Sequence, residues 1–148
     1  MSRHSKLLLS LLTIIWISYV FAILWHSYLD DAYIGFTYLR NFLEGDGFVF
    51  NPGERIEGVT NIGWLFFLLP LASIVSIPVA AKIASLILVL MTLLLAYLTT
   101  SKLFNSNSAL RSAMVVLCIA TSFDYLFFSF SGMETSLMAF LLGLALYV

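Results

Sequence analysis

Residues 78–100 read PVAAKIASLILVLMTLLLAYLTT, and Lys82 is the only charged side chain among them. A helix of about 20 mainly apolar residues is long enough to cross the roughly 30 Å hydrocarbon core of a bilayer. The chain as a whole is 61% hydrophobic and 10% charged, whereas soluble domains are about 45–50% apolar and about 25% charged. We therefore predict an integral membrane protein with an all-α transmembrane fold.

Three further apolar stretches predict membrane spans, at residues 7–28, 113–130 and 135–148. The last runs to Val148 without a polar cap and is too short to cross alone. We therefore expect residues 1–148 to be the N-terminal part of a longer transmembrane domain. Residues 62–77 are also apolar, but this stretch is short and contains Pro70, which is more typical of a juxtamembrane helix.

The cationic side chains predict a multi-pass topology. Arg3 and Lys6 precede the first span, and Lys102 and Arg111 lie in the gap 101–112. Because short cytoplasmic loops are rich in lysine and arginine, both segments are expected in the cytoplasm, with an even number of crossings between them. The spans at 7–28 and 78–100 supply two crossings. Residues 62–77 then stay at the outer surface, and the acidic loop 29–60 is extracytoplasmic.

Within this loop, residues 31–44 are predicted to form a second juxtamembrane helix. Ala32, Phe36, Leu39 and Leu43 recur at near-helical spacing and give one apolar face. Glu44-Gly45-Asp46-Gly47 follows directly. Glycine is the usual residue in the left-handed conformation that ends a helix.

The candidate catalytic residues are the acids Asp30, Asp31 and Glu134. The two aspartates follow the first span, and Glu134 lies between the third and fourth apolar stretches. Carboxylates at a membrane boundary suit a general base or a cation site. Helix capping is the alternative for all three, since an aspartate at the N-cap accepts hydrogen bonds from free N–H groups. Asp124, inside the third stretch, is interpreted as an acid that reaches water at a short or kinked span.

The candidate substrate-binding residues are Arg40 and Arg55, with Glu54 and Glu57. A guanidinium group suits a phosphate, although Glu54 and Glu57 are also able to neutralise Arg55. The single cysteine, Cys118, is interpreted as a small buried side chain. The sequence has no basic stripe that would bind nucleic acid.

Several of these residues belong to longer motifs that resemble a known family. The segments are Asp30-Asp31-Ala32-Tyr33-Ile34, Tyr38-Leu39-Arg40-Asn41, the stretch 44–61, Trp64 and Gly132-Met133-Glu134-Thr135. Together they are similar to the outer loops of polytopic GT-C glycosyltransferases, a group that includes protein O-mannosyltransferases, the lipid A aminoarabinose transferase and cell-wall arabinofuranosyltransferases. Members of this family are several times longer than this chain.

The resemblance implies a GT-C-type helical bundle whose outer loop carries juxtamembrane helices. It implies a catalytic base in Asp30-Asp31, of which Asp30 is preferred because it opens the motif at the end of the first span, with Glu134 at a second acidic position near the site. The expected reaction is inverting transfer of a sugar from a polyprenyl-phosphate donor to an acceptor that the sequence does not identify. No cofactor is required, although a divalent metal is compatible with it. Two alternatives stay open: a polytopic lipid or glycan transporter or flippase, and a membrane scaffold without a site.

Overall fold

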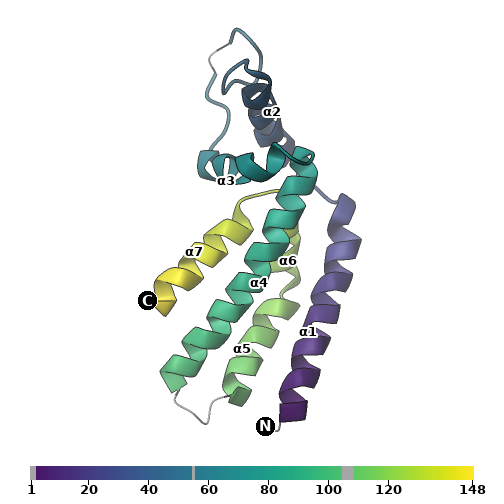
Figure 1. The fold of residues 1–148 in the computed structure, drawn as a ribbon, viewed down its shortest axis with the longest axis vertical. Coiled ribbons are helices and arrows are strands. Elements are labelled where there is room, and N and C mark those ends of the chain that lie inside the picture. The colour runs from purple at the N-terminus through teal and green to yellow at the C-terminus, as the bar shows by residue number, and fades with distance from the viewer. Residues whose placement is uncertain (1–2, 55, 105–108) are drawn as a thin grey trace.

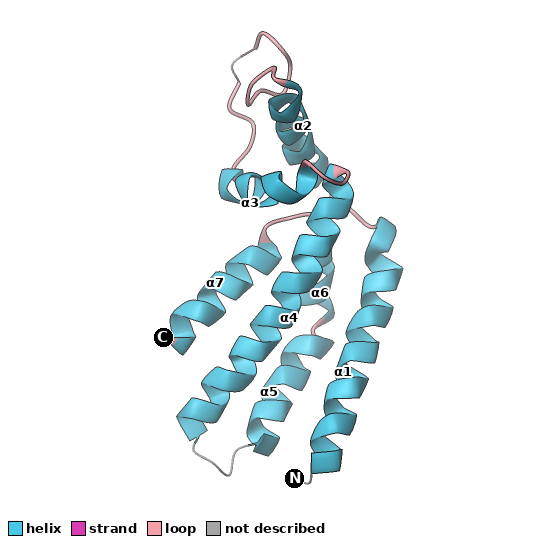
Figure 2. Ribbon diagram, in the orientation of Figure 1, coloured by secondary structure: helices cyan, strands magenta, loops and turns pink. Residues whose placement is uncertain are grey.

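The computed structural model describes residues 3–54, 56–104 and 109–148. Within these residues the regular elements are all helical, as Figure 2 shows. They are α1 (Arg3–Ile23), the 3₁₀ helix η1 (Leu24–His26), α2 (Asp30–Glu44), α3 (Ile62–Ala72), α4 (Ile77–Phe104), α5 (Ala109–Thr121), α6 (Phe123–Phe130) and α7 (Thr135–Tyr147). The predicted all-α class is therefore confirmed for the described part of the chain.

The helices form two regions (Figure 1). The bundle consists of α1, α4, α5, α6 and α7, which run up and down side by side. The outer unit consists of α2, α3 and the loop between them, and it covers one end of the bundle. The chain's N-terminus, the end of α4 and the start of α5 lie at the opposite end. The acidic loop and the cationic segments are thus at opposite ends, the arrangement on which the topology prediction depends.

One described helix, Ile77–Leu103 within α4, is long and apolar enough to cross a membrane by itself. The number rises to three if each of two bent helix pairs counts as one span. The bundle also exposes many large apolar side chains, among them Leu12, Ile15, Leu94 and Leu142, each more than half exposed. Because water would not tolerate such a surface, these findings are consistent with a helical membrane protein.

The third apolar stretch is not the single helix that the sequence predicts. It forms α5 and α6, which meet at Ser122 with a bend of 58°. The Ser122 hydroxyl accepts a hydrogen bond from the Tyr125 amide, and Asp124 lies in the first turn of α6. A serine N-cap followed by an acid is a start signal for a new helix. The kink inferred from Asp124 is therefore present, and the Asp124 side chain is exposed.

Helix α3 is shorter than predicted and ends at Ala72 instead of residue 77. Its 11 residues span about 17 Å, and it lies across the end of the bundle (Figure 1). The new helix α4 starts with Ile77 and Pro78. A proline in the first turn fits there because its missing N–H needs no partner. Residues 73–76 form the turn between α3 and α4.

Helix α2 begins at Asp30, one residue before the predicted start, and its N-cap is Leu29. Asp30 and Asp31 are thus the first two helical residues, and no side chain caps this end. Neither aspartate side chain caps α2, so the capping alternative is wrong for them. Their negative charges in the first turn still interact favourably with the helix dipole. The helix ends as predicted at Gly45, which has φ of 92°.

Two apolar clusters hold these regions together. The first joins α2 and α3 to the beginning of α4 and contains Phe36, Leu39, Trp64 and Leu68. The second joins α1, α4 and α6 lower in the bundle. Leu43, expected on the buried face of α2, is 41% exposed. Cys118 was also expected to be buried, and that is wrong: it lies exposed on a face of α5 that the described chain does not cover.

Candidate active site

The candidate site is built where the two acid-bearing segments meet. The Leu29 amide donates to the Ser131 carbonyl over 3.1 Å, which joins the start of α2 to the α6–α7 connection. The buried Trp64 indole N–H, from α3, donates to the Gly132 carbonyl over 2.9 Å. Three segments that are distant in sequence therefore share one junction.

Gly132 makes this close approach possible. Its φ is 92°, in the left-handed region, and a Cβ there would lie 2.9 Å from the Ala32 Cβ and 3.0 Å from Phe36. A side chain is thus excluded by both the backbone conformation and the space. The glycine in the second acidic motif is required by packing against α2, which brings Glu134 beside the first loop.

A cavity of about 220 Å³ lies at this junction, and Asp31, Ile34, Asn61 and Met133 are among its lining residues. The Asn61 side-chain amide donates to the Glu134 carboxylate over 3.0 Å. The buried Asn61 Oδ1 has no hydrogen-bond partner among the described residues. Asp31 and Asn61 therefore line one small cavity, from α2 and from the start of α3, and Glu134, at the start of α7, is bonded to Asn61 next to the lining residue Met133.

Asp30 and Asp31 differ in their relation to this cavity. Both side chains are exposed, but only Asp31 lines the cavity. Within the described residues, neither carboxylate makes a hydrogen bond or an ion pair. Asp31 is thus free to accept a proton from a group bound in the cavity, and the geometry singles it out from its neighbour.

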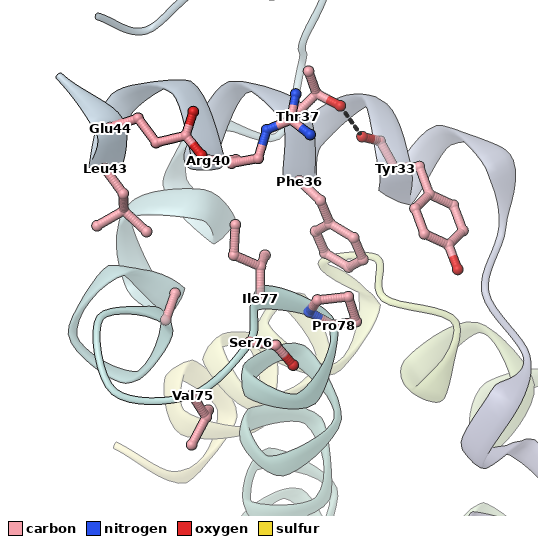
Figure 3. Close-up of a pocket in the computed structure, with 11 residues that line it drawn as sticks. Tyr33, Phe36, Thr37, Arg40, Leu43, Glu44, Val75, Ser76, Ile77 and Pro78 are labelled. Carbon is pink, nitrogen blue, oxygen red and sulfur yellow. Dashed lines mark hydrogen bonds between the residues drawn. The ribbon is translucent and has the colours of Figure 1, made fainter. Parts of the chain in front are cut away.

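Arg40 lies away from the acids, in a groove of about 470 Å³ between α2 and the α3–α4 turn. Nine positions on an α-helix are about two and a half turns, so Arg40 and Asp31 point to opposite sides of α2. Figure 3 shows Phe36 and Ile77 pointing into the groove, with Arg40 along α2 at its edge. The structure does not bring Arg40 and Asp31 into one cavity.

The remaining predicted binding residues are also apart from the acids. Glu54 accepts a hydrogen bond of 3.0 Å from Asn51 in the exposed turn. Glu57 lines a third hollow, of about 500 Å³, beside Tyr38 and Phe48. Arg55 lies outside the described residues. No group of three or more His, Cys, Asp or Glu side chains that could hold a metal ion is present in the described part of the chain.

Other polar residues fix the loop around the cavity. The buried Tyr38 hydroxyl donates to the Ile56 carbonyl over 2.7 Å and accepts from the Gly58 amide over 2.9 Å. Asn41 donates to the Val49 and Phe50 carbonyls. These bonds tie residues 49–50 and 56–58 to α2 and hold Gly58 at the cavity wall. In the sequence, Tyr38 and Asn41 are recognisable as polar residues on an otherwise apolar face of the helix.

Tyr28, which lies between η1 and α2, supports the same junction. Its hydroxyl donates to the Pro78 carbonyl over 3.2 Å. This bond joins the segment before α2 to the start of α4.

One curated relative matches much of the chain. It is a "Terminal beta-(1->2)-arabinofuranosyltransferase" from Mycobacterium tuberculosis, 30% identical over 124 residues, which cover 78% of this chain and 20% of the relative. The chain thus spans about one fifth of the length of the relative it matches. No family model matches the chain, and no solved structure matches it. The similarity supports a relation to glycosyltransferases.

Proposed function

We propose that this chain forms part of a glycosyltransferase of the GT-C type. The reaction is inverting transfer of a sugar from a polyprenyl-phosphate donor to an extracytoplasmic acceptor, such as a glycolipid, a cell-wall glycan or a protein. The observation that carries the proposal is the cavity lined by Asp31 and Asn61, with Glu134 bonded to Asn61 beside it. Its support is the similarity to an arabinofuranosyltransferase over 124 residues, which cover 78% of this chain.

The chemistry needs few protein groups. A lipid phosphate is already a good leaving group, so transfer requires a base that takes the proton from the acceptor hydroxyl. In the proposed step the hydroxyl oxygen forms a bond to the anomeric carbon, and the bond from that carbon to the phosphate oxygen breaks. We assign the base to Asp31, because it lines the cavity and its carboxylate is unpaired. Asp30 is the alternative base.

Glu134 is proposed to orient the acceptor or the base. Its carboxylate is held by Asn61 on one oxygen, which leaves lone pairs for a hydroxyl group. Positive charge near the departing phosphate would stabilise the charge that develops there. Arg40 and Arg55 are the candidates for this role from the sequence, but Arg40 points away from Asp31, so the structure does not support it at a phosphate beside this cavity.

The site is proposed to lie outside the cytoplasmic membrane, with the N-terminus inside. In a variant without Cys118, single cysteines at Asn51 and at Asn107 test this arrangement; Asn107 lies outside the described residues. An impermeant thiol reagent added to intact cells should label the cysteine at Asn51 and spare the one at Asn107. Labelling of both, or of the second alone, would show that the assignment of sides is wrong.

A transporter or flippase is the competing function. Transporters place ionisable groups near the membrane midplane at broken helices, and the break at Ser122 beside Asp124 is a feature of this kind. Asp124, however, is exposed on the surface of the bundle. The other acids gather at the end of the bundle, which favours the enzyme.

The deciding experiment uses the full-length protein, reconstituted with a radiolabelled polyprenyl-phosphate sugar and membrane acceptors. Transfer of label to an acceptor is expected, and Asp31→Asn should reduce its rate by about 10²–10⁴, the usual contribution of a general base. Asp46→Asn is the matched control, because it removes an exposed carboxylate of the same loop that does not line the cavity. Movement of the lipid across the bilayer without transfer would support the transporter instead.

If Asp31→Asn transfers sugar at the parental rate and Asp30→Asn does not, the base is Asp30. If both variants are fully active while folded and inserted normally, neither aspartate is the base. The proposal would then fail for the first acidic motif.

A further inference from the structure

Lys82 is a fully buried lysine in the first turns of α4, with 0% of its surface exposed. Its ammonium group donates to three backbone carbonyls, those of Leu24 at 2.6 Å, Ser27 at 2.8 Å and Phe130 at 2.5 Å. The Tyr28 ring lies beside it, with its centroid 4.1 Å from Nζ. Ionisable side chains inside a membrane bundle are costly and usually have a function.

The three carbonyls belong to helix ends. Leu24 is in η1, Ser27 is its C-cap, and Phe130 is the last residue of α6. Carbonyls at a helix C-terminus lack partners within the helix, and the helix dipole places negative charge there, which favours a cation. Lys82 therefore joins two helix ends from α1–η1 and α6 to a third helix through charge-assisted hydrogen bonds, which are the stronger kind.

Both helix ends lead directly into the acidic motifs. Ser27 precedes Asp30 by three positions, and Phe130 precedes Glu134 by four. The Leu29–Ser131 backbone hydrogen bond lies between these anchor points and the acids. The position of each acid relative to the other thus depends on how closely the two helix ends are held together.

Lys82 has no remaining donor for a substrate. An ammonium group has three N–H donors, and all three point to the carbonyls of Leu24, Ser27 and Phe130. It is therefore separate from the cations that would meet the lipid phosphate. Its distance from the chemistry makes it a positioning residue.

We propose that Lys82 sets the register of the two acidic motifs, that is, their relative position, so that Asp31 at the cavity and Glu134, bonded to the cavity residue Asn61, lie close together during sugar transfer. The catalytic part of this inference rests on the proposed glycosyltransferase function. The geometric part does not, because the relative position of the two loops is measurable without turnover.

The test measures geometry and activity in the same full-length variants. Cysteines replace Ile34 and Met133, which both line the cavity, in a background in which Cys118 is alanine. A short bifunctional thiol reagent added from outside should link them readily in the parent. Lys82→Met keeps the length of the side chain and removes every donor, whereas Lys82→Gln keeps two N–H donors without the charge.

Leu93→Ala is the matched control. Leu93 lies farther along α4, is 6% exposed, and belongs to the lower apolar cluster. Its truncation leaves a cavity and lowers the stability of the bundle without touching the loops. General destabilisation should therefore affect Leu93→Ala and Lys82→Met alike, whereas loss of register should affect Lys82→Met alone.

Cross-linking should slow in the order parent, Lys82→Gln, Lys82→Met, and remain at the parental rate in Leu93→Ala. Without the added cysteines, Lys82→Met should lose roughly 10- to 100-fold in kcat, the cost of about 1 Å of misplacement, with an unchanged KM for the lipid donor. If Lys82→Met does not fold, Lys82→Gln carries the comparison. Parental cross-linking in both Lys82 variants would overturn the inference.

The two proposals can fail separately. If the parent shows no glycosyl transfer but cross-linking still depends on Lys82, the enzyme proposal fails and the geometric role stands. If the parent is active and the Lys82 variants lose cross-linking without losing activity, the catalytic consequence of the register is refuted.

Discussion

Polar side chains have different hydrogen-bond partners in the bundle and in the outer unit. In the bundle, Thr92, Thr100 and Thr121 donate to carbonyls four residues earlier in their own helices. In the outer unit, polar side chains join segments that are distant in sequence, such as Asn61 to Glu134 and Trp64 to Gly132. These threonines of the bundle thus bond within their own helices, and Lys82 and Trp16 are among the exceptions that bond between helices, whereas the outer unit uses its polar side chains to fix its shape.

The difference follows from the surroundings of each region. Helices in a bilayer pack mainly through van der Waals contacts, and their interhelical hydrogen bonds contribute little on average. The loop of the outer unit cannot rely on helical hydrogen bonds, so its backbone groups need side-chain partners. We therefore expect that a single side-chain substitution near the cavity alters its geometry, whereas the bundle tolerates most side-chain substitutions.

The largest difference should appear between two acids, one from each region. Glu134→Gln keeps an acceptor for Asn61 but removes the charge beside the cavity, and transfer should fall by about 10²-fold if Glu134 orients the reacting groups. Asp124→Asn removes an exposed carboxylate from the bundle and should leave the rate within about twofold of the parent. Steady-state kinetics of the two purified variants would measure this contrast. An equal loss of transfer rate in the two variants would indicate that Asp124 also takes part in the reaction.

Two glycines give the next contrast, in stability. Gly132→Ala introduces a side chain at φ of 92° and 2.9 Å from Ala32. The backbone conformation costs about 1–3 kcal/mol, and the overlap adds a further penalty of about 1–3 kcal/mol. In α7, a Cβ at Gly143 would lie 3.6 Å from Leu95, an ordinary contact. Gly143→Ala should therefore stabilise the helix by about 0.5–1 kcal/mol.

Thermal unfolding of both glycine variants in detergent would show the effect. We expect a lower melting temperature for Gly132→Ala and an equal or higher one for Gly143→Ala. A parental melting temperature and parental activity for Gly132→Ala would contradict the tight approach of the second loop to α2.

The smallest contrast involves two tryptophans. Trp64 is 1% exposed and donates to Gly132, so Trp64→Phe leaves a buried carbonyl without its partner, at a cost of about 1–3 kcal/mol. Trp16 is 40% exposed and donates to the Ala120 carbonyl in the bundle. Trp16→Phe should cost about 0.6 kcal/mol, the average for interhelical bonds in a membrane protein. Denaturation in mixed micelles would compare the two, and a larger loss for Trp16→Phe would reverse the comparison between the regions.

Much of the architecture follows from local sequence. The glycine stop at Gly45 and the apolar face of α2 through Ala32, Phe36 and Leu39 are local signals, and the structure confirms them. The break at Ser122 was also readable, as a capping serine followed by Asp124, but the apolar residues around it dominated the prediction of one long span. Asp31 and Arg40 are nine positions apart in one helix, and this spacing alone already places them on opposite sides of α2.

The site itself depends on contacts that no local pattern contains. Asn61 and Glu134 are 73 positions apart, and Lys82 is 58 positions from Leu24 and 48 from Phe130. The sequence shows only a lone lysine in an apolar run, which predicts a function without naming its partners. The choice between Asp30 and Asp31 likewise needs the cavity, because both are first-turn residues of the same helix.

The central claim is that Asp31 and Glu134 act in one site, and a double-mutant cycle in the full-length protein tests it most directly. The rates of sugar transfer would be measured for Asp31→Asn, Glu134→Gln and the variant that carries both. Residues that act as a unit give grossly non-additive losses. We predict that the double variant is no slower than Asp31→Asn alone. Losses that multiply, so that the double variant falls by the product of the two single effects, would contradict a shared site.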